Sequence, residues 1–406
     1  MFRVATSTKD MPMRLRLTLL GSTLLALVGP PVAPAAEPNV SDGLLPFVEK
    51  NQLAGAVVLV ASADKVLATE AVGFADREAR VAMTTDDLFW IASMTKPMTA
   101  AALMMLVDEK KVALDDPIEK YLPEFKAATV LAYQDKDTTL LKKPARAPTV
   151  RDCLRHTSGM PFRSALEEPT LDRFLLRDAV RGYALTPLQY EPGTKHVYSN
   201  AGINTAGRII EVVGGTNYED FMAKRLFVPL GMTDTVWRPT AEQMKRLAKS
   251  YKPTKDGTNL EVIPVTQLAQ PLTDPHRQPV PAGGLFSTAK DTAAFGQMIL
   301  RGGTHGDKRL LSEAAVRELT GTQTYGVLGK GEGGYGLGFS TSRRAKVGGP
   351  AVAGPCGHGG AYATHLWINP DNKLVTVYMV QHAGFPGEGG RARDVFEQAA
   401  AKMYGK

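Results

Sequence analysis

The chain has 406 residues, 44% of them hydrophobic, and a formal net charge of +7 at pH 7. No basic run is interleaved with aromatic residues, so the sequence gives no support to a nucleic-acid partner. Two cysteines are too few for a disulfide scaffold or a cysteine-rich zinc site, and the seven histidines are scattered without a His-Glu-x-x-His pattern. We therefore predict no metal and no other cofactor.

Residues 1–36 have the order of a secretory signal peptide. Arg14 and Arg16 precede an apolar run at 17–28, and small residues follow at 33–36. The run is too short to span a bilayer as a mature helix, although a retained N-terminal anchor is the alternative. We expect export of residues 37–406 to the periplasm or the medium, with no stable membrane span after cleavage. Export would permit one disulfide between Cys153 and Cys356, but two buried free thiols are the favoured interpretation.

Hydrophobic patterning and turn residues predict the order of elements along the mature chain. Helices are expected at 41–51, 93–109, 149–155 and 201–213, a glycine turn followed by a helix at 283–301, and hairpins at 56–72 and 364–380. The helix at 93–109 is apolar on nearly all faces, so it should be buried. Residues 241–281 are polar and rich in proline, which predicts an irregular rim or lid over a pocket.

Ser93 and Lys96 are the first candidate catalytic residues. Positions i and i+3 share one face of a helix, and a desolvated lysine can take the proton of a serine hydroxyl. The pattern alone is weak, because it recurs at Ser62/Lys65, which reads as a hairpin turn, and at Ser287/Lys290, which reads as a helix cap. Whether Ser93 and Lys96 are catalytic therefore depends on partner residues elsewhere in the chain.

Two further motifs supply possible partners. Tyr198 and Asn200 precede the helix at 201–213, where a phenol can relay a proton and an amide can hold a substrate carbonyl. His358 is flanked by glycines that let a ligand approach the backbone. A packed surface turn and a glycine-rich strand entry are the structural alternatives. His156, at the end of the helix at 149–155, is interpreted as a hydrogen-bonded structural histidine rather than a base.

Taken together, Ser93-x-x-Lys96, Tyr198-x-Asn200 and His358-Gly359-Gly360 resemble the three motifs of serine hydrolases in the β-lactamase and penicillin-binding-protein superfamily. The similarity is greatest to class C β-lactamases, D-alanyl-D-alanine peptidases and family VIII carboxylesterases, and it covers nearly all of the mature chain. The linking segments are similar too, at 114–117, 156–159, 229–232 and 283–288.

The resemblance implies an α/β (α+β) fold with an antiparallel sheet flanked by helices. Residues 37–115 and 283–406 would form the α/β part and 116–282 a mostly helical part. It also implies that Ser93 attacks an acyl carbon, with Lys96 and Tyr198 as a coupled base and acid. The backbone N–H groups of Ser93 and Ala361 would form the oxyanion hole, and the substrate would be bound by a further set of residues: Asn200, His358, Gly359 and Gly360.

The third motif departs from the family pattern, in which β-lactamases and peptidases usually carry Lys-Thr-Gly. A neutral histidine offers no fixed cation for a substrate carboxylate, and Gly359 offers no hydroxyl. This favours uncharged small-molecule esters with short acyl chains, unless His358 becomes protonated in its pocket. A β-lactamase or a peptidase that cleaves amides is the alternative, followed by a non-catalytic penicillin-binding-like protein. The sequence leaves acyl-chain preference and oligomeric state open.

Overall fold

The computed structural model describes residues 39–324, 326–327, 334–342 and 354–405. The predicted signal segment 1–36 lies outside the described residues. The described residues belong to one compact unit. No helix of the described ranges combines the length and the apolar character needed to cross a membrane.

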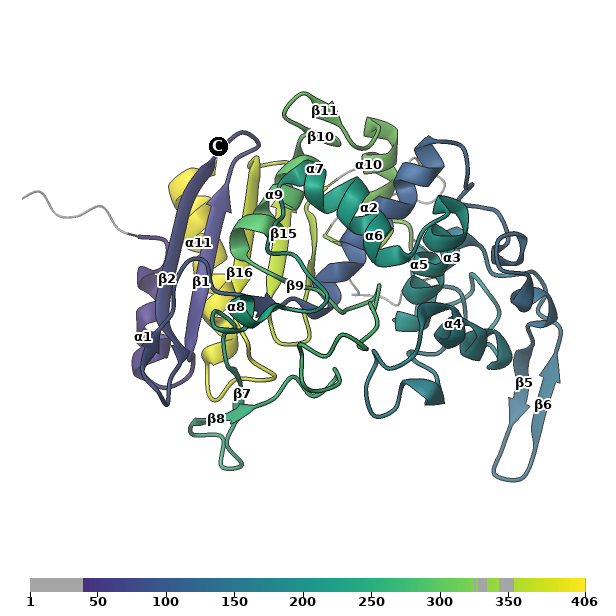
Figure 1. Ribbon diagram of the computed structural model, residues 1–406, viewed down its shortest axis with the longest axis horizontal. Coiled ribbons are helices and arrows are strands. Elements are labelled where there is room, and N and C mark those ends of the chain that lie inside the picture. Colours follow the sequence, from purple (N-terminus) through teal and green to yellow (C-terminus); the bar gives the residue numbers. More distant parts are fainter. Residues whose placement is uncertain (1–38, 325, 328–333, 343–353, 406) are drawn as a thin grey trace, which may run out of the picture. The chain divides into compact units, whose positions relative to one another are not determined.

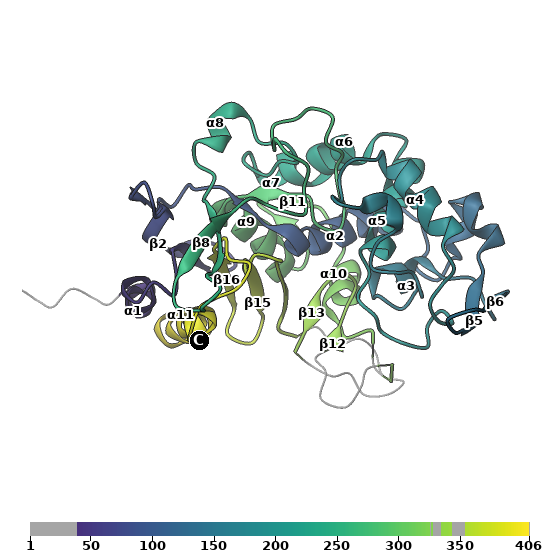
Figure 2. The ribbon, with the colours of Figure 1, turned by 90° about the horizontal axis from the view of Figure 1, so that it is seen from below.

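An eight-stranded sheet forms the framework of this unit, with the strand order β12-β13-β14-β15-β16-β1-β2-β3. Each neighbouring pair is antiparallel. The N-terminal strands are β1 Gly55–Ala61, β2 Val66–Asp76 and β3 Val81–Ala82. The C-terminal strands are β12 Gly334–Tyr335, β13 Ser340–Thr341, β14 Cys356–Gly359, β15 His365–Asn369 and β16 Leu374–Met379. In Figure 2, β12 and β13 lie at the opposite end of the sheet from β2.

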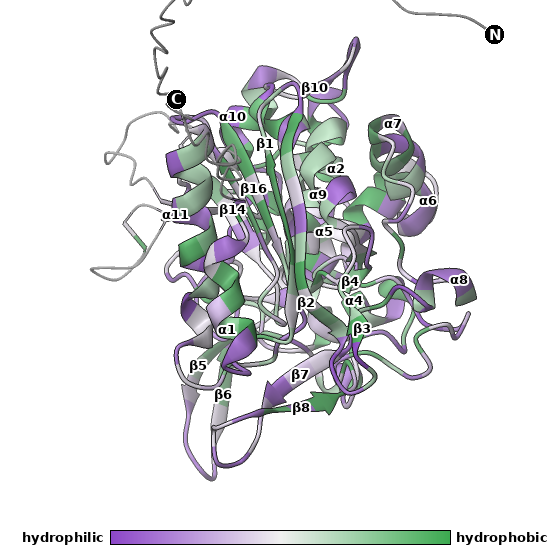
Figure 3. Ribbon diagram, turned by 90° about the vertical axis from the view of Figure 1, so that its left-hand side faces the viewer, coloured by the Kyte–Doolittle hydropathy of each residue, from purple (hydrophilic) through white to green (hydrophobic). Residues whose placement is uncertain are grey.

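The centre of the sheet joins the two ends of the chain. Val57 in β1 lies opposite Met379 in β16 and opposite Ala71 in β2. All residues of β1 are buried, because both faces of the sheet are covered by helices. α1 Leu45–Glu49 and α11 Ala392–Tyr404 lie on one face, and α9 Ala289–Leu300 packs on the other (Figures 1 and 3).

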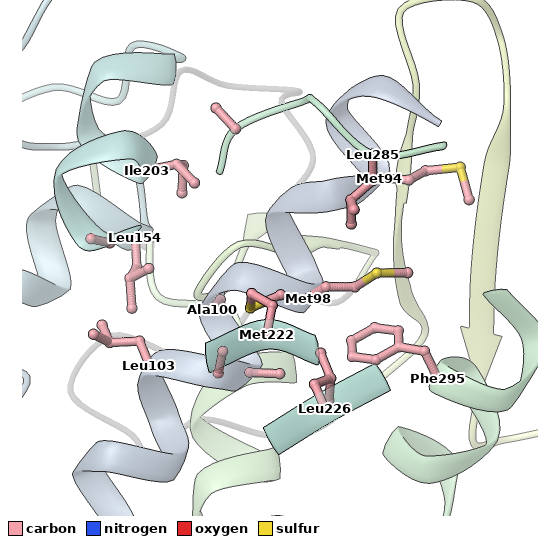
Figure 4. Close-up of a cluster of buried hydrophobic side chains, with 14 of the residues drawn as sticks. Met94, Met98, Ala100, Leu103, Leu154, Ile203, Met222, Leu226, Leu285 and Phe295 are labelled. Atoms are coloured by element: carbon pink, nitrogen blue, oxygen red, sulfur yellow. The ribbon is translucent and has the colours of Figure 1, made fainter. Parts of the chain in front are cut away.

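Helix α2, Thr95–Asp108, lies in the interior between α9 and the helical region. Every residue from Thr95 to Leu106 is buried, as its apolar faces predict. Figure 4 shows Met98 and Leu103 of this helix pointing into a cluster that includes Ile203 of α5 and Phe295 of α9. α2 also packs on α10 Glu313–Thr320. The central helix thus joins the sheet to the helical region.

Most of the remaining elements lie between 116 and 282. The helices are α3 Val150–Leu154, α4 Leu176–Leu185, α5 Asn200–Gly214, α6 Tyr218–Met222, α7 Val228–Leu230 and α8 Ala241–Met244. The short strands pair as β4 Phe89–Trp90 with β9 Phe286–Ser287, β5 Val130–Gln134 with β6 Thr139–Lys142, β7 Ser250–Pro253 with β8 Leu260–Ile263, and β10 Thr304–His305 with β11 Lys308–Arg309. The domain boundaries near 115 and 283 stay a prediction.

The helices and hairpins expected from the sequence are confirmed, with end points shifted by a few residues, and so is the α/β (α+β) class. The expectation of an irregular segment at 241–281 is wrong in part, since it contains α8 and the β7–β8 hairpin. Tyr251 packs with Ala54 and Leu260 and donates its backbone N–H to the Gln381 carbonyl at 2.8 Å. These are tertiary contacts, which local sequence does not reveal. Cys153 and Cys356 are both buried and free, which confirms the two-thiol interpretation.

Candidate active site

Ser93 lies in a tight turn at the entry to the central helix. It is the middle residue of a 3₁₀ turn at Ala92–Met94, and α2 follows directly. Ala92 has a φ of 44°, a left-handed conformation that residues with a side chain seldom adopt. Such strain persists where the surroundings fix the backbone, and here Ile91 N–H donates to the Leu285 carbonyl at 3.0 Å. The candidate nucleophile is therefore presented on a fixed turn.

The third sequence motif packs against the same turn through Gly360. A Cβ on Gly360 would lie 2.6 Å from the Ile91 carbonyl oxygen and 2.0 Å from Thr364 Oγ1, so only glycine fits. Thr364 Oγ1 donates to the Ile91 carbonyl at 3.4 Å. This packing brings Ala361 to the cavity that Ser93 also lines.

Lys96 is fully buried beside the serine. Its Nζ lies 3.0 Å from Ser93 Oγ and donates to the Ala282 carbonyl at 2.6 Å. Burial holds the pKa of Lys96 well below its usual value. A neutral amine has two N–H groups and one lone pair, so it can donate to Ala282 and accept the Ser93 proton at the same time. The geometry and the desolvation together suit a general base.

The Ala282 backbone is itself held by a buried network that we call the lysine-side network, made of Asn204, Tyr183 and Glu167. Ala282 N–H donates to Asn204 Oδ1 at 3.0 Å, and Asn204 Nδ2 donates to Tyr183 Oη at 2.9 Å. Tyr183 Oη donates to Glu167 Oε1 at 2.6 Å. Burial raises the pKa of Glu167. Three side chains far apart in sequence thus fix the carbonyl that orients Lys96.

Tyr198 faces both catalytic candidates. Lys96 Nζ lies 4.7 Å from the centroid of its ring. Burial raises the pKa of Tyr198, and a hydrogen bond with Ser93 offsets this only in part. The phenol is therefore protonated at neutral pH, while burial disfavours the charged form of the neighbouring amine.

Asn200 is the first residue of α5, directly after the helix cap Ser199. It is 4% exposed and lines the cavity, and its Oδ1 is buried with no hydrogen-bond partner in the part of the chain that the structure describes. Buried polar atoms are normally paired, so the predicted role of this amide in binding the substrate stays a prediction that its position permits.

His358, in strand β14, is a neutral residue. Its Nδ1 lies 2.7 Å from the Gly359 carbonyl, and its Nε2 lies 3.0 Å from Tyr335 Oη and 3.4 Å from Tyr198 Oη. Burial lowers the pKa of His358 to about 3. The open question of a protonated His358 is thus answered in favour of the neutral form, which gives the site no cation.

A cavity of about 300 Å³ opens beside these residues. It is lined by Trp90, Ala92, Ser93, Phe162, Leu171, Tyr198, Asn200, Gln267, Ala282, Gly283, Gly359, Gly360 and Ala361. None of these described residues carries a charge. Lys96 contacts Ser93 from behind the cavity and His358 contacts Tyr198, so the structure brings all eight predicted site residues together. Their individual roles stay predictions.

The sequence matches the family model for Beta-lactamase over residues 44–400. The chain belongs to the beta-lactamase family. It is 30% identical over 329 residues to the "Putative D-alanyl-D-alanine carboxypeptidase" of Escherichia coli K12, which covers 74% of this chain and 70% of that protein. "Esterase EstB" of Burkholderia gladioli is 28% identical over 370 residues, which covers 84% of this chain and 89% of EstB.

Among solved structures, "EstCE1, a hydrolase with promiscuous acyltransferase activity" is similar, with a TM-score of 0.73 and 25% identity, covering 89% of this chain and 97% of EstCE1. These similarities, together with the Ser93 site, make this member of the beta-lactamase family a serine hydrolase.

Sequence reasoning missed several residues of this beta-lactamase-family site. Ala282 acts through its carbonyl group, which has no side-chain signature. Tyr335 lies in a glycine-rich stretch, where an aromatic residue between glycines was an available signal. Asn204 and Glu167 looked like ordinary polar residues, and nothing in their local sequence connects them.

Proposed function

We propose that the chain is a serine esterase that cleaves uncharged carboxylic esters with short acyl chains. The observation that carries the proposal is the absence of charge from the described residues that line the cavity, with neutral His358 where the motif of β-lactamases and peptidases usually has a lysine. An ester has no charge to neutralise, so such a cavity binds it without desolvating an unpaired ion. The small volume of about 300 Å³ favours short acyl groups.

Acylation begins with attack of Ser93 Oγ on the ester carbonyl carbon. The hydroxyl proton passes to the neutral Lys96 amine, 3.0 Å away. The backbone N–H groups of Ser93 and Ala361 stabilise the oxyanion that forms. When the carbon–oxygen bond to the alcohol breaks, Tyr198 donates its proton to the departing alkoxide, and Lys96 then restores the phenol. Lys96 and Tyr198 titrate as a coupled pair.

Deacylation uses the same groups in reverse. A water molecule attacks the acyl carbon and gives a proton to the Lys96 and Tyr198 pair. The bond between the acyl carbon and Ser93 Oγ breaks, Ser93 recovers a proton, and the carboxylic acid leaves.

A β-lactamase or D-alanyl peptidase activity is the second candidate, and the similarity to the Escherichia coli carboxypeptidase favours it. The same residues would cleave an amide. Against it, a missing charge-assisted contact of about 1.5 to 3 kcal/mol weakens a carboxylate-bearing substrate roughly ten- to a hundredfold.

The test compares wild type and Ser93→Ala on p-nitrophenyl butyrate and on the cephalosporin nitrocefin. We expect ester cleavage to exceed nitrocefin turnover, and to fall at least about a thousandfold in the variant. Ser62→Ala is the matched control, because Ser62 belongs to the second Ser-x-x-Lys pattern, at the β1–β2 turn. This variant should keep full activity. Substantial esterase activity in Ser93→Ala would rule out the proposed nucleophile, and nitrocefin turnover that matches ester cleavage would favour the second candidate.

Export is a further part of the proposal and rests on the sequence of residues 1–36 alone. A periplasmic or secreted enzyme should have an N-terminus near residue 37. Mass spectrometry of the protein from the native host measures this directly.

A further inference from the structure

A line of directed hydrogen bonds runs behind the cavity from the start of α5 to the third motif. It consists of His156, Tyr335 and His358, and we call it the histidine relay. His156 Nδ1 accepts the Ser199 backbone N–H at 3.2 Å, and His156 Nε2 lies 3.0 Å from Tyr335 Oη. Tyr335 Oη lies 3.0 Å from His358 Nε2, and His358 Nδ1 lies 2.7 Å from the Gly359 carbonyl.

The two ends of the relay determine where each proton lies. A backbone N–H can only donate, so His156 Nδ1 is unprotonated and the ring proton of this neutral histidine is on Nε2. A carbonyl can only accept, so His358 carries its proton on Nδ1 and its Nε2 is a lone pair. Tyr335 therefore accepts from His156 and donates to His358. The two histidines have opposite tautomers.

This direction matters because Tyr198 competes for the same lone pair. Tyr198 Oη lies 3.4 Å from His358 Nε2, farther than Tyr335 at 3.0 Å. Imidazole Nε2 has one lone pair, and the closer Tyr335 hydroxyl occupies it. The proton of Tyr198 is then left for Ser93 and for the leaving group.

We propose that Tyr335 is a positioning residue of the esterase, which occupies the lone pair of His358 Nε2 and so keeps the Tyr198 proton available for the departing alkoxide. His156 supports it by donating to Tyr335 and fixing the direction of the relay. The inference rests on the proposed ester hydrolysis, and it adds a role for two residues outside the three motifs.

The test removes one hydroxyl and varies the leaving group. In Tyr335→Phe, the freed lone pair of His358 accepts a hydrogen bond from the Tyr198 hydroxyl, which directs its proton away from the leaving group. Turnover of ethyl butyrate, whose alkoxide needs a proton to leave, should fall at least about tenfold in kcat with KM within about twofold. Turnover of p-nitrophenyl butyrate should fall much less, because nitrophenolate leaves without a proton. Equal losses on both esters, or no loss, would overturn the proposal.

A second variant separates positioning from packing. Adding His358→Asn to Tyr335→Phe removes the competing acceptor, and ethyl butyrate turnover should then recover by at least about threefold relative to Tyr335→Phe. A purely structural Tyr335 predicts a further loss instead. Tyr378→Phe is the matched control, because the Tyr378 hydroxyl is buried without a hydrogen-bond partner among the described residues of the sheet. It should leave the ratio of the two ester activities unchanged.

The tautomers can also be measured in the unmodified protein. Long-range ¹⁵N–¹H spectra of histidine-labelled enzyme, assigned with His358→Asn, should show His358 protonated on Nδ1 and His156 on Nε2. The same tautomer in both rings would overturn the proposal even if Tyr335→Phe does not fold. If the wild type shows no Ser93-dependent ester cleavage, the proposed function and this inference both fail. If ester cleavage is intact but Tyr335→Phe leaves the ratio of ethyl butyrate to p-nitrophenyl butyrate turnover unchanged, only the inference fails.

Discussion

The two sides of Ser93 are supported in different ways. On one side, the lysine-side network of Asn204, Tyr183 and Glu167 holds the Ala282 carbonyl, which binds Lys96 at 2.6 Å. On the other side, the histidine relay passes hydrogen bonds through aromatic rings to the loop after β14. The first support ends on a carboxyl group and the second on backbone atoms only.

The contrast shows two routes to a neutral site. On the lysine side, burial lowers the pKa of the amine, and its partner is a carbonyl instead of a carboxylate, so the neutral form with a free lone pair is favoured. The histidine side uses a ring whose pKa is lowered to about 3, so no cation forms near the substrate. The lysine side should therefore govern the rate of the chemical step. The histidine side should govern where the Tyr198 proton is donated and whether a charged substrate can bind.

The largest expected effect is that of Lys96→Met, which removes the amine and keeps the volume. We expect kcat on p-nitrophenyl butyrate to fall about a thousandfold, because no other described group near Ser93 is placed to take its proton. The free energy of unfolding should stay equal or increase, since the variant no longer buries an amine. Steady-state kinetics and urea unfolding measure both quantities. Lys65→Met, in the second Ser-x-x-Lys pattern at the β1–β2 turn, is the control. A small change of kcat in Lys96→Met would show that the lysine side does not dominate catalysis.

A smaller effect on activity is expected for Asn204→Leu, which breaks the lysine-side network. The Ala282 N–H and the Tyr183 hydroxyl lose buried partners, so the free energy of unfolding should fall by about 2 to 3 kcal/mol. The loosened carbonyl should lower kcat about tenfold, a loss we expect from poorer orientation of Lys96. Thr205→Val on the same helix removes a hydroxyl that donates to the Ala201 carbonyl at 2.8 Å, and it should change neither quantity as much. A stable Asn204→Leu with full kcat would show that Ala282 needs no support.

The smallest effect is on the pH dependence of stability, where the two sides should have opposite signs. Between pH 6.5 and 3, His358 is unprotonated in the folded chain and protonated in the unfolded chain, so acidification lowers stability, by about 2 kcal/mol at pH 5. Glu167 has a raised pKa, so above pH 4.5 it retains a proton longer in the folded chain, and acidification raises stability.

Urea unfolding from pH 7 to pH 5 separates the two contributions. His358→Asn should make the loss of stability on acidification shallower, and Glu167→Gln should make it steeper. The other buried histidines contribute equally to all three proteins, so the differences isolate the two residues. If both variants changed the pH dependence of the free energy of unfolding in the same direction, the predicted opposite contributions of His358 and Glu167 would be wrong.

The sequence predicted the parts of the site that depend on local patterns. Ser93 and Lys96 share a helix face through their spacing, and Tyr198 and Asn200 lie on either side of the α5 cap Ser199, so short-range geometry and motif order placed them. The apolar faces of α2 and the β-like runs of the hairpin at 56–72 predicted buried elements in the same way.

The supporting groups could not be predicted because their partners are distant and carry no local signal. Ala282 acts through a backbone carbonyl, and Tyr335 reaches the site because β12 pairs at the end of the sheet. The position of His156 at a helix end indicates a structural role. That it donates to Tyr335 can be inferred only from the positions of Ser199 and Tyr335 in the fold. The β7–β8 hairpin was missed because its polar and proline residues hide the burial of Tyr251.

The pairing of Val57 with Met379 also governs how this chain folds. β1 has only the β2 hairpin as a partner until β16 has been synthesised, and an isolated hairpin is marginally stable in water. The nascent chain must therefore wait for its last strands before the sheet can close, which gives the fold a high contact order and a slow, late collapse. Shortening the chain before β16 would leave an apolar strand with an unpaired edge, a surface prone to aggregation.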